Sequence, residues 1–469
     1  MLLDEKLYKR ICEWVDEHKE EFIADLQDFA RIKSVSRADL AEPGAPFGAD
    51  CRTMLDHALA RCREYGFETC DNEGYFGDAW TGERKTAVGI IGHLDVVPEG
   101  DGWSYPPYGA TRVGDFLVGR GVGDNKSACV MGMYVLRMMK EIEAPLTNGA
   151  RVIFGCSEET GMEDMAYLVE NKLQPPVSLV PDAGFPVNYA QKGMMRGEMS
   201  IETGSVLKAF SGGEVRNMVP PHAMAELTVS AEEARAKLDD TVTVEEAEGG
   251  CIVRAIGKAA HAAGPQNGES AILKLSTALA ASGLLDETSQ KAIEGIKEMC
   301  SDYYGANAGI DCEDPETGKT TMVCGVSETK DGRISLSLDC RLSIATDLDA
   351  CGKSFTAFAQ KLGFTVDDLG IDKPFYMAKD DPRIDLLRRV CKEYAGLDAE
   401  PYTMGGGTYS RAVPNAITFG SGFPDRGERM DFGPGKGGAH QPDEHTYLPN
   451  LIEALKLMAV AVILLDRLV

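Results

Sequence analysis

The first 190 residues alternate short apolar runs with segments in which apolar residues recur at helical spacing. The apolar runs occupy residues 87–94, 151–156 and 177–180, and the helical segments occupy residues 5–32, 48–65, 125–140 and 162–172. A continuous apolar run is typical of a strand buried on both faces, and alternation with helices is typical of parallel sheets. The pattern therefore predicts an α/β domain with a mainly parallel central sheet, whose functional side chains lie where the strands end.

The apolar spacing changes between residues 191 and 376, where segments such as GEMSIET and RISLSLDCRL alternate polar with apolar residues. Alternation indicates half-exposed antiparallel strands, and helical segments lie between them. We therefore expect residues 191–376 to form an inserted α+β domain, and residues 1–190 and 377–469 to form the α/β domain that it interrupts.

The C-terminal segment 448–469 is predicted to be a long helix. Its uncharged run, residues 457–465, is about half as long as a membrane-spanning helix and indicates a buried amphipathic helix. The N-terminus lacks the apolar stretch and cleavage site of a signal peptide, which predicts a cytoplasmic protein.

The charge of the chain excludes some classes of partner. Its 469 residues include 74 acidic and 48 basic side chains, a formal net charge of -26. Nucleic acids and anionic membranes are bound by an excess of Lys and Arg, so neither is expected as a partner. The 13 cysteines are scattered without a C-x-x-C pair, which favours neither a disulfide framework nor a thiolate zinc site.

Polar side chains follow several of the predicted strands. His93 and Asp95 lie two residues apart at a strand end, so their side chains point to the same face of the strand. A carboxylate that orients a metal-binding imidazole needs this arrangement. Asp124 lies in a Gly-rich loop that opens a helix, and Glu158 and Glu159 follow the next strand. The alternatives are a phosphate-binding loop around Asp124, whose spacing matches neither known phosphate motif, and a helix-capping acidic pair at the two glutamates.

Asp182 after the third strand and His440 in a Gly-rich loop complete a set of five oxygen and nitrogen ligands, with His93, Asp124 and Glu159. Such a set suits a pair of borderline cations, Zn or Mn, bridged by a carboxylate.

Seven motifs in this order resemble the M20 metallopeptidase family, and within it the PepV-like dipeptidases. They are GHLDVVPEGDGW, GRGVGDNKS, SEETGMED, PDAGFP, GKAAHAAGPQNGESA, MGGGTYSR and GAHQPDE, and they cover nearly the whole chain. The resemblance implies a zinc-peptidase-type catalytic domain interrupted by a lid domain, with two divalent metal ions, Zn first and Mn or Co as alternatives.

The resemblance also implies the role of each ligand. His93 and Asp182 would bind one metal and Glu159 and His440 the other, with Asp124 as the bridge. Asp95 would orient His93, and Glu158 would be the general base. The bond that follows Asp124 would be cis, and the family's usual Asp at the next position is replaced here by Asn125.

Substrate-binding residues of the lid follow from the same resemblance. His261 would reach the substrate carbonyl oxygen, and Asn217 and Arg341 would hold the C-terminal side of the substrate. The loop Gly405, Gly406 and Gly407 would offer backbone N–H groups to the substrate carboxylate. Without the resemblance, His261 would be read as a surface histidine and Arg341 as a strand-edge charge.

The expected activity is hydrolysis of a dipeptide or a similarly small peptide by a metal-activated water. Removal of an acyl group from an N-acyl amino acid and cleavage of a tripeptide are the alternatives within the family. A non-catalytic peptide-binding protein is a further alternative, against which Glu158, a carboxylate with no ligand role, argues. Resemblance to PepV-like enzymes implies that the second half of the lid replaces a partner's lid, so the chain is expected to be a monomer.

Overall fold

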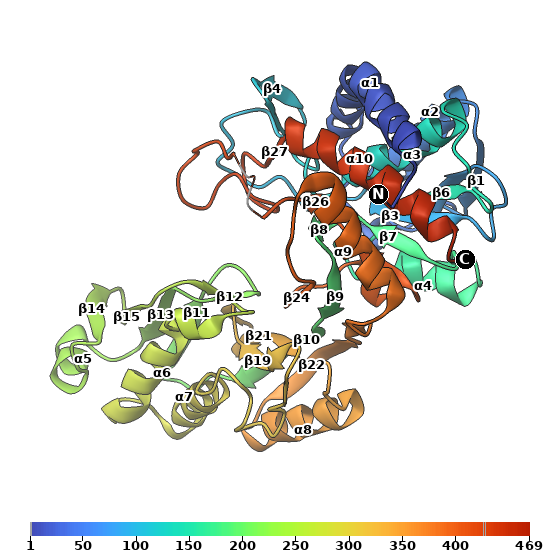
Figure 1. The fold of residues 1–469 in the computed structure, drawn as a ribbon. Helices are drawn as coiled ribbons and strands as arrows, with labels where there is room; N and C mark the ends of the chain where they lie inside the picture. The colour runs from blue at the N-terminus through green and yellow to red at the C-terminus, as the bar shows by residue number, and fades with distance from the viewer. Residues whose placement is uncertain (1, 425, 427) are drawn as a thin grey trace. The chain divides into compact units, whose positions relative to one another are not determined.

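The computed structural model describes residues 2–424, 426 and 428–469, which fold as two units (Figure 1). Unit 1 comprises Met1–Tyr189, Met377–Tyr402 and Thr408–Val469. Unit 2 comprises Ala190–Tyr376 together with a short second segment, Thr403–Gly407.

The apolar runs of the N-terminal segment form the centre of the unit 1 sheet. The sheet has the order β1-β2-β6-β3-β7-β25-β9-β23, and β24 pairs with β9. Its strands are β1 (Glu68–Asn72), β2 (Phe76–Trp80), β3 (Val88–His93), β6 (Ala150–Gly155), β7 (Ser178–Val180), β9 (Asn188–Gln191), β23 (Phe375–Tyr376), β24 (Tyr402–Met404) and β25 (Ala416–Thr418). All of β23 and the ends of β9 and β24 consist of residues that are counted with unit 2. The central strands β6, β3, β7 and β25 run parallel, and every residue of them is buried.

The outer strands of this sheet differ from the predicted pattern. β1, β2, β9 and β23 pair antiparallel, so the sheet is mixed rather than parallel throughout. The sequence did not predict β2 because the charged residue Asp78 interrupts its apolar run. Asp78 is nevertheless fully buried. The carboxylate of Asp78 accepts from Arg84 at 2.7 Å and from Arg151 at 2.6 Å, and these ion pairs compensate for its burial.

Helices cover the unit 1 sheet. They are α1 (Glu5–Arg31), α2 (Gly48–Glu64), α3 (Lys126–Glu141), α4 (Glu163–Glu170), α9 (Pro382–Ala395) and α10 (Leu448–Asp466). A small sheet of β4 (Thr111–Val113), β5 (Phe116–Val118) and β27 (His445–Tyr447) and the strand pair β8 (Ala183–Gly184) and β26 (Ser421–Gly422) complete the unit.

Helix α10 is buried on nearly all sides rather than amphipathic. Among the described residues it is the one helix whose length and composition would suffice to cross a membrane, and 72% of its most apolar stretch is buried inside the protein. It packs against α1, α3 and α9, so neighbouring helices cover faces that an amphipathic helix would expose (Figure 1).

Unit 2 is built on an antiparallel sheet in the order β14-β15-β13-β11-β20-β21-β10-β22, with β19 pairing β21. The strands are β10 (Gly193–Glu202), β11 (Leu207–Gly212), β13 (His222–Leu227), β14 (Val242–Ala247), β15 (Gly250–Ile256), β19 (Thr321–Val323), β20 (Ser327–Lys330), β21 (Arg333–Leu342) and β22 (Thr365–Asp372). Two short pairs are added, β12 (Met218–Val219) with β16 (Ala260–His261), and β17 (Glu313–Asp314) with β18 (Gly318–Lys319).

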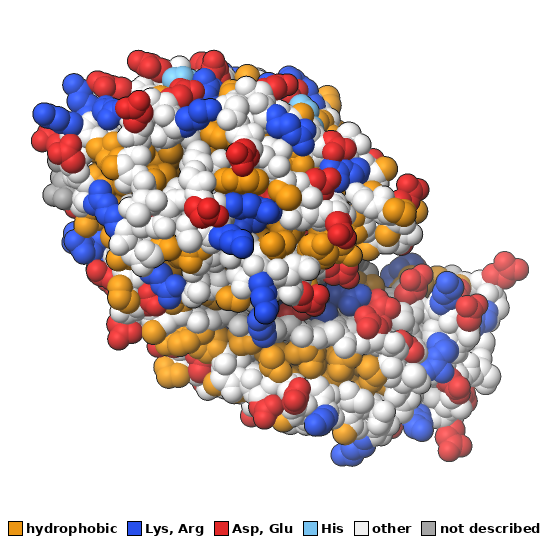
Figure 2. All heavy atoms as spheres, turned by 90° about the vertical axis from the view of Figure 1, so that its right-hand side faces the viewer, with side chains coloured by type: hydrophobic (Ala, Val, Ile, Leu, Met, Phe, Trp, Pro, Cys, Tyr) orange, Lys and Arg blue, Asp and Glu red, His pale blue; other side chains and the backbone are white. Residues whose placement is uncertain are grey.

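Helices α5 (Ala231–Lys237), α6 (Ala271–Ser282), α7 (Glu287–Met299) and α8 (Leu348–Lys361) pack on the unit 2 strands (Figure 1). Apolar side chains of these helices and strands form the core of the unit. On the outside of the molecule, acidic and basic side chains are interspersed over the face drawn in Figure 2.

Candidate active site

The predicted metal ligands of unit 1 lie at the ends of its central strands. His93 is the last residue of β3, Glu159 lies four residues beyond the end of β6, and Asp182 lies two residues beyond the end of β7. Since these strands are parallel, their carboxyl ends meet at one edge of the sheet. Asp124 precedes α3 and His440 precedes β27, and both reach the same place.

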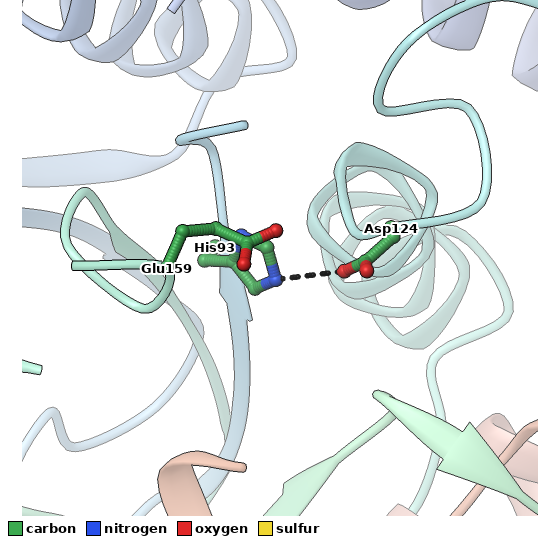
Figure 3. A group of neighbouring side chains, drawn as sticks. All are labelled: His93, Asp124 and Glu159. Atoms are coloured by element: carbon green, nitrogen blue, oxygen red, sulfur yellow. Dashed lines mark hydrogen bonds and ion pairs between the residues drawn. The ribbon is translucent and has the colours of Figure 1, made fainter. Parts of the chain in front are cut away.

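His93, Asp124 and Glu159 point toward one another (Figure 3). One ligand atom from each of the three lies within 4.8 Å of the others. His93 Nε2 is 3.1 Å from Asp124 Oδ1 and 3.9 Å from Asp182 Oδ1. His440 Nε2 is 3.1 Å from Asp124 Oδ2 and 3.0 Å from Glu159 Oε1. The two oxygens of Asp124 therefore face two different imidazoles.

The charges at this edge of the sheet suit divalent cations. Burial raises the pKa of Glu159, and it raises the pKa of Asp182 to about 8 with help from the neighbouring carboxylates. Burial also opposes the charge on Asp124, but hydrogen bonds from His440 and His93 hold the pKa of Asp124 below its usual range. Clustered, buried carboxylates are costly without a cation, so this donor set fits a divalent metal ion.

Asp95 holds both its neighbouring histidine and the two glutamates. Its backbone oxygen lies 2.9 Å from His93 Nδ1, and its Oδ1 lies 3.5 Å from the same nitrogen. Its carboxylate also accepts from the backbone N–H of Glu158 at 3.2 Å and of Glu159 at 3.0 Å. The sequence predicted the contact of Asp95 with His93 only. The hydrogen bonds from Glu158 and Glu159 were found in the structure.

Asn125 is a site residue to which the sequence assigned no role. The peptide bond between Asp124 and Asn125 is cis, as the resemblance implied. The amide of Asn125 donates to Asp182 Oδ1 at 2.8 Å and to the backbone oxygen of Pro181 at 2.9 Å, and its oxygen accepts from the N–H of His93 at 3.3 Å. An aspartate could not donate these hydrogen bonds, which gives a physical reason for Asn at this position.

Arg341 of unit 2 is buried in the middle of the sheet and is not a strand-edge charge. Its guanidinium donates to both oxygens of Asp339, at 2.6 and 3.0 Å, and to the backbone oxygen of Gly405 at 3.1 Å. Among the described residues, these bonds use three of the five N–H donors of Arg341 and leave two. Asp339 was missed, although residues two apart on a strand share a face.

His261 and Asn217 lie together in unit 2. β12 and β16 pair so that Met218 faces His261, and the backbone oxygen of Asn217 accepts from the N–H of Ala262 at 2.9 Å. Partial burial, followed by the charge of Arg341, lowers the pKa of His261. Gly405, Gly406 and Gly407 belong to the same unit, and a Cβ added at Gly405 would lie 2.8 Å from the Cβ of Ala263.

Comparison with known proteins gives matches over most of the chain. Residues 89–463 match the model of Peptidase family M20/M25/M40. The chain is 29% identical over 461 residues to the Bacillus subtilis (strain 168) protein named "Putative dipeptidase YtjP", with 95% of this chain and 97% of that protein covered.

Solved structures show the same fold. Human carnosine dipeptidase 1 matches with a TM-score of 0.62 at 18% identity, covering 98% of this chain and 99% of that one. The YXEP protein of Bacillus subtilis, described as a dinuclear metal binding peptidase from the M20 family, matches with a TM-score of 0.51 at 10% identity, covering 97% and 100%.

Proposed function

The chain belongs to Peptidase family M20/M25/M40, as its motifs predicted, and is a metallopeptidase; on this premise we propose that it hydrolyses dipeptides at a centre of two divalent metal ions. The dipeptidase name of its relative and the dinuclear description of the YXEP protein support the substrate and the metal count. The chain is expected to act as a monomer.

The proposed ligands divide into two groups around Asp124. His93 and Asp182 would hold one ion, Glu159 and His440 would hold the other, and Asp124 would contribute to both sites. The observation that carries this assignment is the position of the Asp124 carboxylate, whose Oδ1 faces His93 and whose Oδ2 faces His440, both at 3.1 Å. When bound, two such ions supply the Lewis acidity that makes water a nucleophile at neutral pH, and zinc is proposed first, with manganese or cobalt as alternatives.

Glu158 is the proposed general base. It is adjacent to the ligand Glu159, and its backbone N–H is held by Asp95 at 3.2 Å. Its carboxylate would accept a proton from the attacking water and then donate that proton to the departing amine. The same carboxylate would therefore act first as a base and then as an acid.

The residues of unit 2 are proposed to hold the peptide. His261 donates to the carbonyl oxygen as negative charge develops there. Arg341 offers its two remaining N–H donors to the C-terminal carboxylate, with Asn217 and the backbone of Gly405, Gly406 and Gly407. Because Asp339 already compensates the charge of Arg341, directional hydrogen bonds contribute more to this recognition than net charge does.

Removal and replacement of metal tests the proposal. A chelator-treated sample is expected to lose hydrolysis of dipeptides and to regain it with two equivalents of Zn, Mn or Co per chain, measured by amine release. Dipeptides should be cleaved faster than tripeptides or N-acetyl amino acids of matched side chain. Full activity in the metal-free sample would exclude the metal mechanism, and faster release of acetate would assign a deacylase.

A further inference from the structure

The Gly-rich loop before α3 surrounds a carboxylate that comes from the other end of the chain. Glu444 Oε1 accepts from the backbone N–H groups of Gly121 at 3.1 Å, Gly123 at 3.0 Å and Asp124 at 3.1 Å. The backbone oxygen of Glu444 also accepts from the N–H of Gly119 at 2.9 Å. Converging backbone N–H groups form an anion site, and here the anion is a side chain of the protein.

The second oxygen of this carboxylate is paired with a buried cation. Arg120 Nη1 donates to Glu444 Oε2 at 2.7 Å, and both side chains are 2% exposed. The guanidinium of Arg120 lies 5.2 Å from the ring centre of Trp103, over its face, and its Nη2 donates to the backbone oxygens of Pro98 and Glu99 at 3.4 Å. With three N–H groups on one oxygen and a guanidinium on the other, the Glu444 carboxylate has a single orientation.

The loop has the shape that this contact requires. Gly121 has a φ of +81°, and a Cβ added there would lie 2.9 Å from Val96 Cγ1. A residue with a side chain would therefore be strained at this position. Glu444 is also four residues beyond His440, so one carboxylate joins the segment that carries Asp124 to the segment that carries His440.

We propose that Glu444 is a positioning residue for the metal centre, which fixes the Asp124 carboxylate between the two ion sites and sets the distance from Asp124 to His440. This role rests on the proposed metal ligands. Residues that orient metal ligands typically contribute about 10- to 100-fold to metal affinity, and Glu444 acts on two ligand segments at once.

Asp466 provides a matched control. It is buried in the same unit, and its carboxylate accepts from the backbone N–H groups of Thr147, Asn148 and Gly149, the last two at 2.9 and 3.3 Å. This loop precedes β6, whereas the proposed ligands His93, Glu159 and Asp182 lie at or beyond the carboxyl ends of β3, β6 and β7. Glu444→Gln and Asp466→Asn thus make the same chemical change, a buried carboxylate to an amide, near the site and far from it.

The experiment measures binding of Zn²⁺ to the wild type and both variants by competition with a chromogenic chelator, and the visible spectrum of the Co²⁺ forms. Glu444→Gln is expected to bind Zn²⁺ about 10- to 100-fold more weakly and to change the Co²⁺ spectrum. Asp466→Asn is expected to stay within twofold of the wild type for Zn²⁺, although its melting temperature falls. Arg120→Met, which leaves the three N–H contacts of Glu444 in place, should weaken Zn²⁺ binding in the same direction.

Zn²⁺ affinity within twofold of the wild type for Glu444→Gln, with an unchanged Co²⁺ spectrum, would overturn the role. Equal loss of affinity in Asp466→Asn would also overturn it, because general destabilisation would then explain the effect. If Glu444→Gln does not fold, the Zn²⁺ affinity and the Co²⁺ spectrum of Arg120→Met provide the same test of the role of Glu444. A wild type that binds two ions yet cleaves no dipeptide would refute the proposed function and leave the positioning role standing.

Discussion

At the scale of single residues, the carboxylate of Asp95 holds the backbone turn that carries Glu158 and Glu159. Its two oxygens accept from the consecutive N–H groups of Glu158 and Glu159. The backbone turn is therefore held at two adjacent points, while the Glu159 side chain reaches His440 at 3.0 Å. Two neighbouring carboxylates with identical chemistry can thus have different roles.

Substitution of the two glutamates should separate these roles. Glu158→Gln is expected to lower kcat by about 10²- to 10⁴-fold while two metal ions stay bound, because only the proton acceptor is lost. Glu159→Gln is expected to lose metal as well as activity, because a ligand is lost. Metal content measured beside steady-state kinetics distinguishes them, and equal metal loss in both variants would show that the assignment is wrong.

Substrate recognition by unit 2 can be tested in the same way. Arg341→Met should raise KM for a dipeptide by roughly 10- to 100-fold, since a hydrogen bond to a charged group contributes about 1.5–3 kcal/mol. The same variant should barely affect a dipeptide with an amidated C-terminus. By contrast, His261→Ala should lower kcat for both substrates by roughly 10²- to 10³-fold, because its bond strengthens as charge develops.

Two results would contradict these assignments. A near-normal kcat for His261→Ala would show that His261 does not stabilise the transition state. Equal effects of Arg341→Met on free and amidated substrates would show that Arg341 does not bind the C-terminal carboxylate of the substrate.

At the scale of elements, the start of α7 shows how one side chain joins a helix to a strand. Asp286 accepts from the N–H groups of Thr288 at 3.1 Å and Ser289 at 3.2 Å, and from that of Val206, just before β11, at 2.8 Å. Gly204 allows this approach, since a Cβ added there would lie 2.2 Å from Asp286 Oδ1. Hydrogen bonds, first that of the Ser289 hydroxyl, hold the pKa of Asp286 below its usual range.

The lowered pKa predicts how the stability of this element depends on pH. A carboxyl group whose pKa is lower in the folded than in the unfolded protein stabilises the fold above the unfolded value, near 3.9, and this stabilisation is lost as pH falls. Asp286→Ala is expected to cost about 0.5–2 kcal/mol at pH 7 and less at pH 3. Urea unfolding followed by circular dichroism at both pH values checks this, and an equal cost at both would refute it.

At the scale of the whole molecule, the edges of the unit 2 sheet are acidic. Edge strand β14 exposes Glu245 and Glu246, and edge strand β22 exposes Asp367 and Asp368. Charged edge strands resist pairing with a second copy, and the formal net charge of -26 adds repulsion between chains.

The oligomeric state follows as a prediction. Light scattering after size-exclusion chromatography is expected to give one species at the mass of a single chain, 50.6 kDa, at assay concentration and in 0.5 M salt, about where charge repulsion is screened. A stable dimer under either condition would contradict the expectation and would call for a partner's lid in catalysis.

The sequence by itself determined the centre of the unit 1 sheet, the antiparallel character of unit 2 and the side chains that gather at the strand ends. Strand and helix periodicities are local, and a strand buried on both faces must be apolar along its length, so β3, β6 and β7 could be located from residue order alone. The residues that follow them, His93, Glu159 and Asp182, then meet because parallel strands end at one edge.

Only the tertiary structure decided which buried charges pair. Asp78 lies in a strand that no apolar run revealed, and Arg120 and Glu444 are 324 residues apart in sequence. Periodicity states which face of an element is buried but not which loop will lie against it. A buried carboxylate is stable only where specific N–H groups or guanidinium groups surround it, and those groups are brought together by the completed fold.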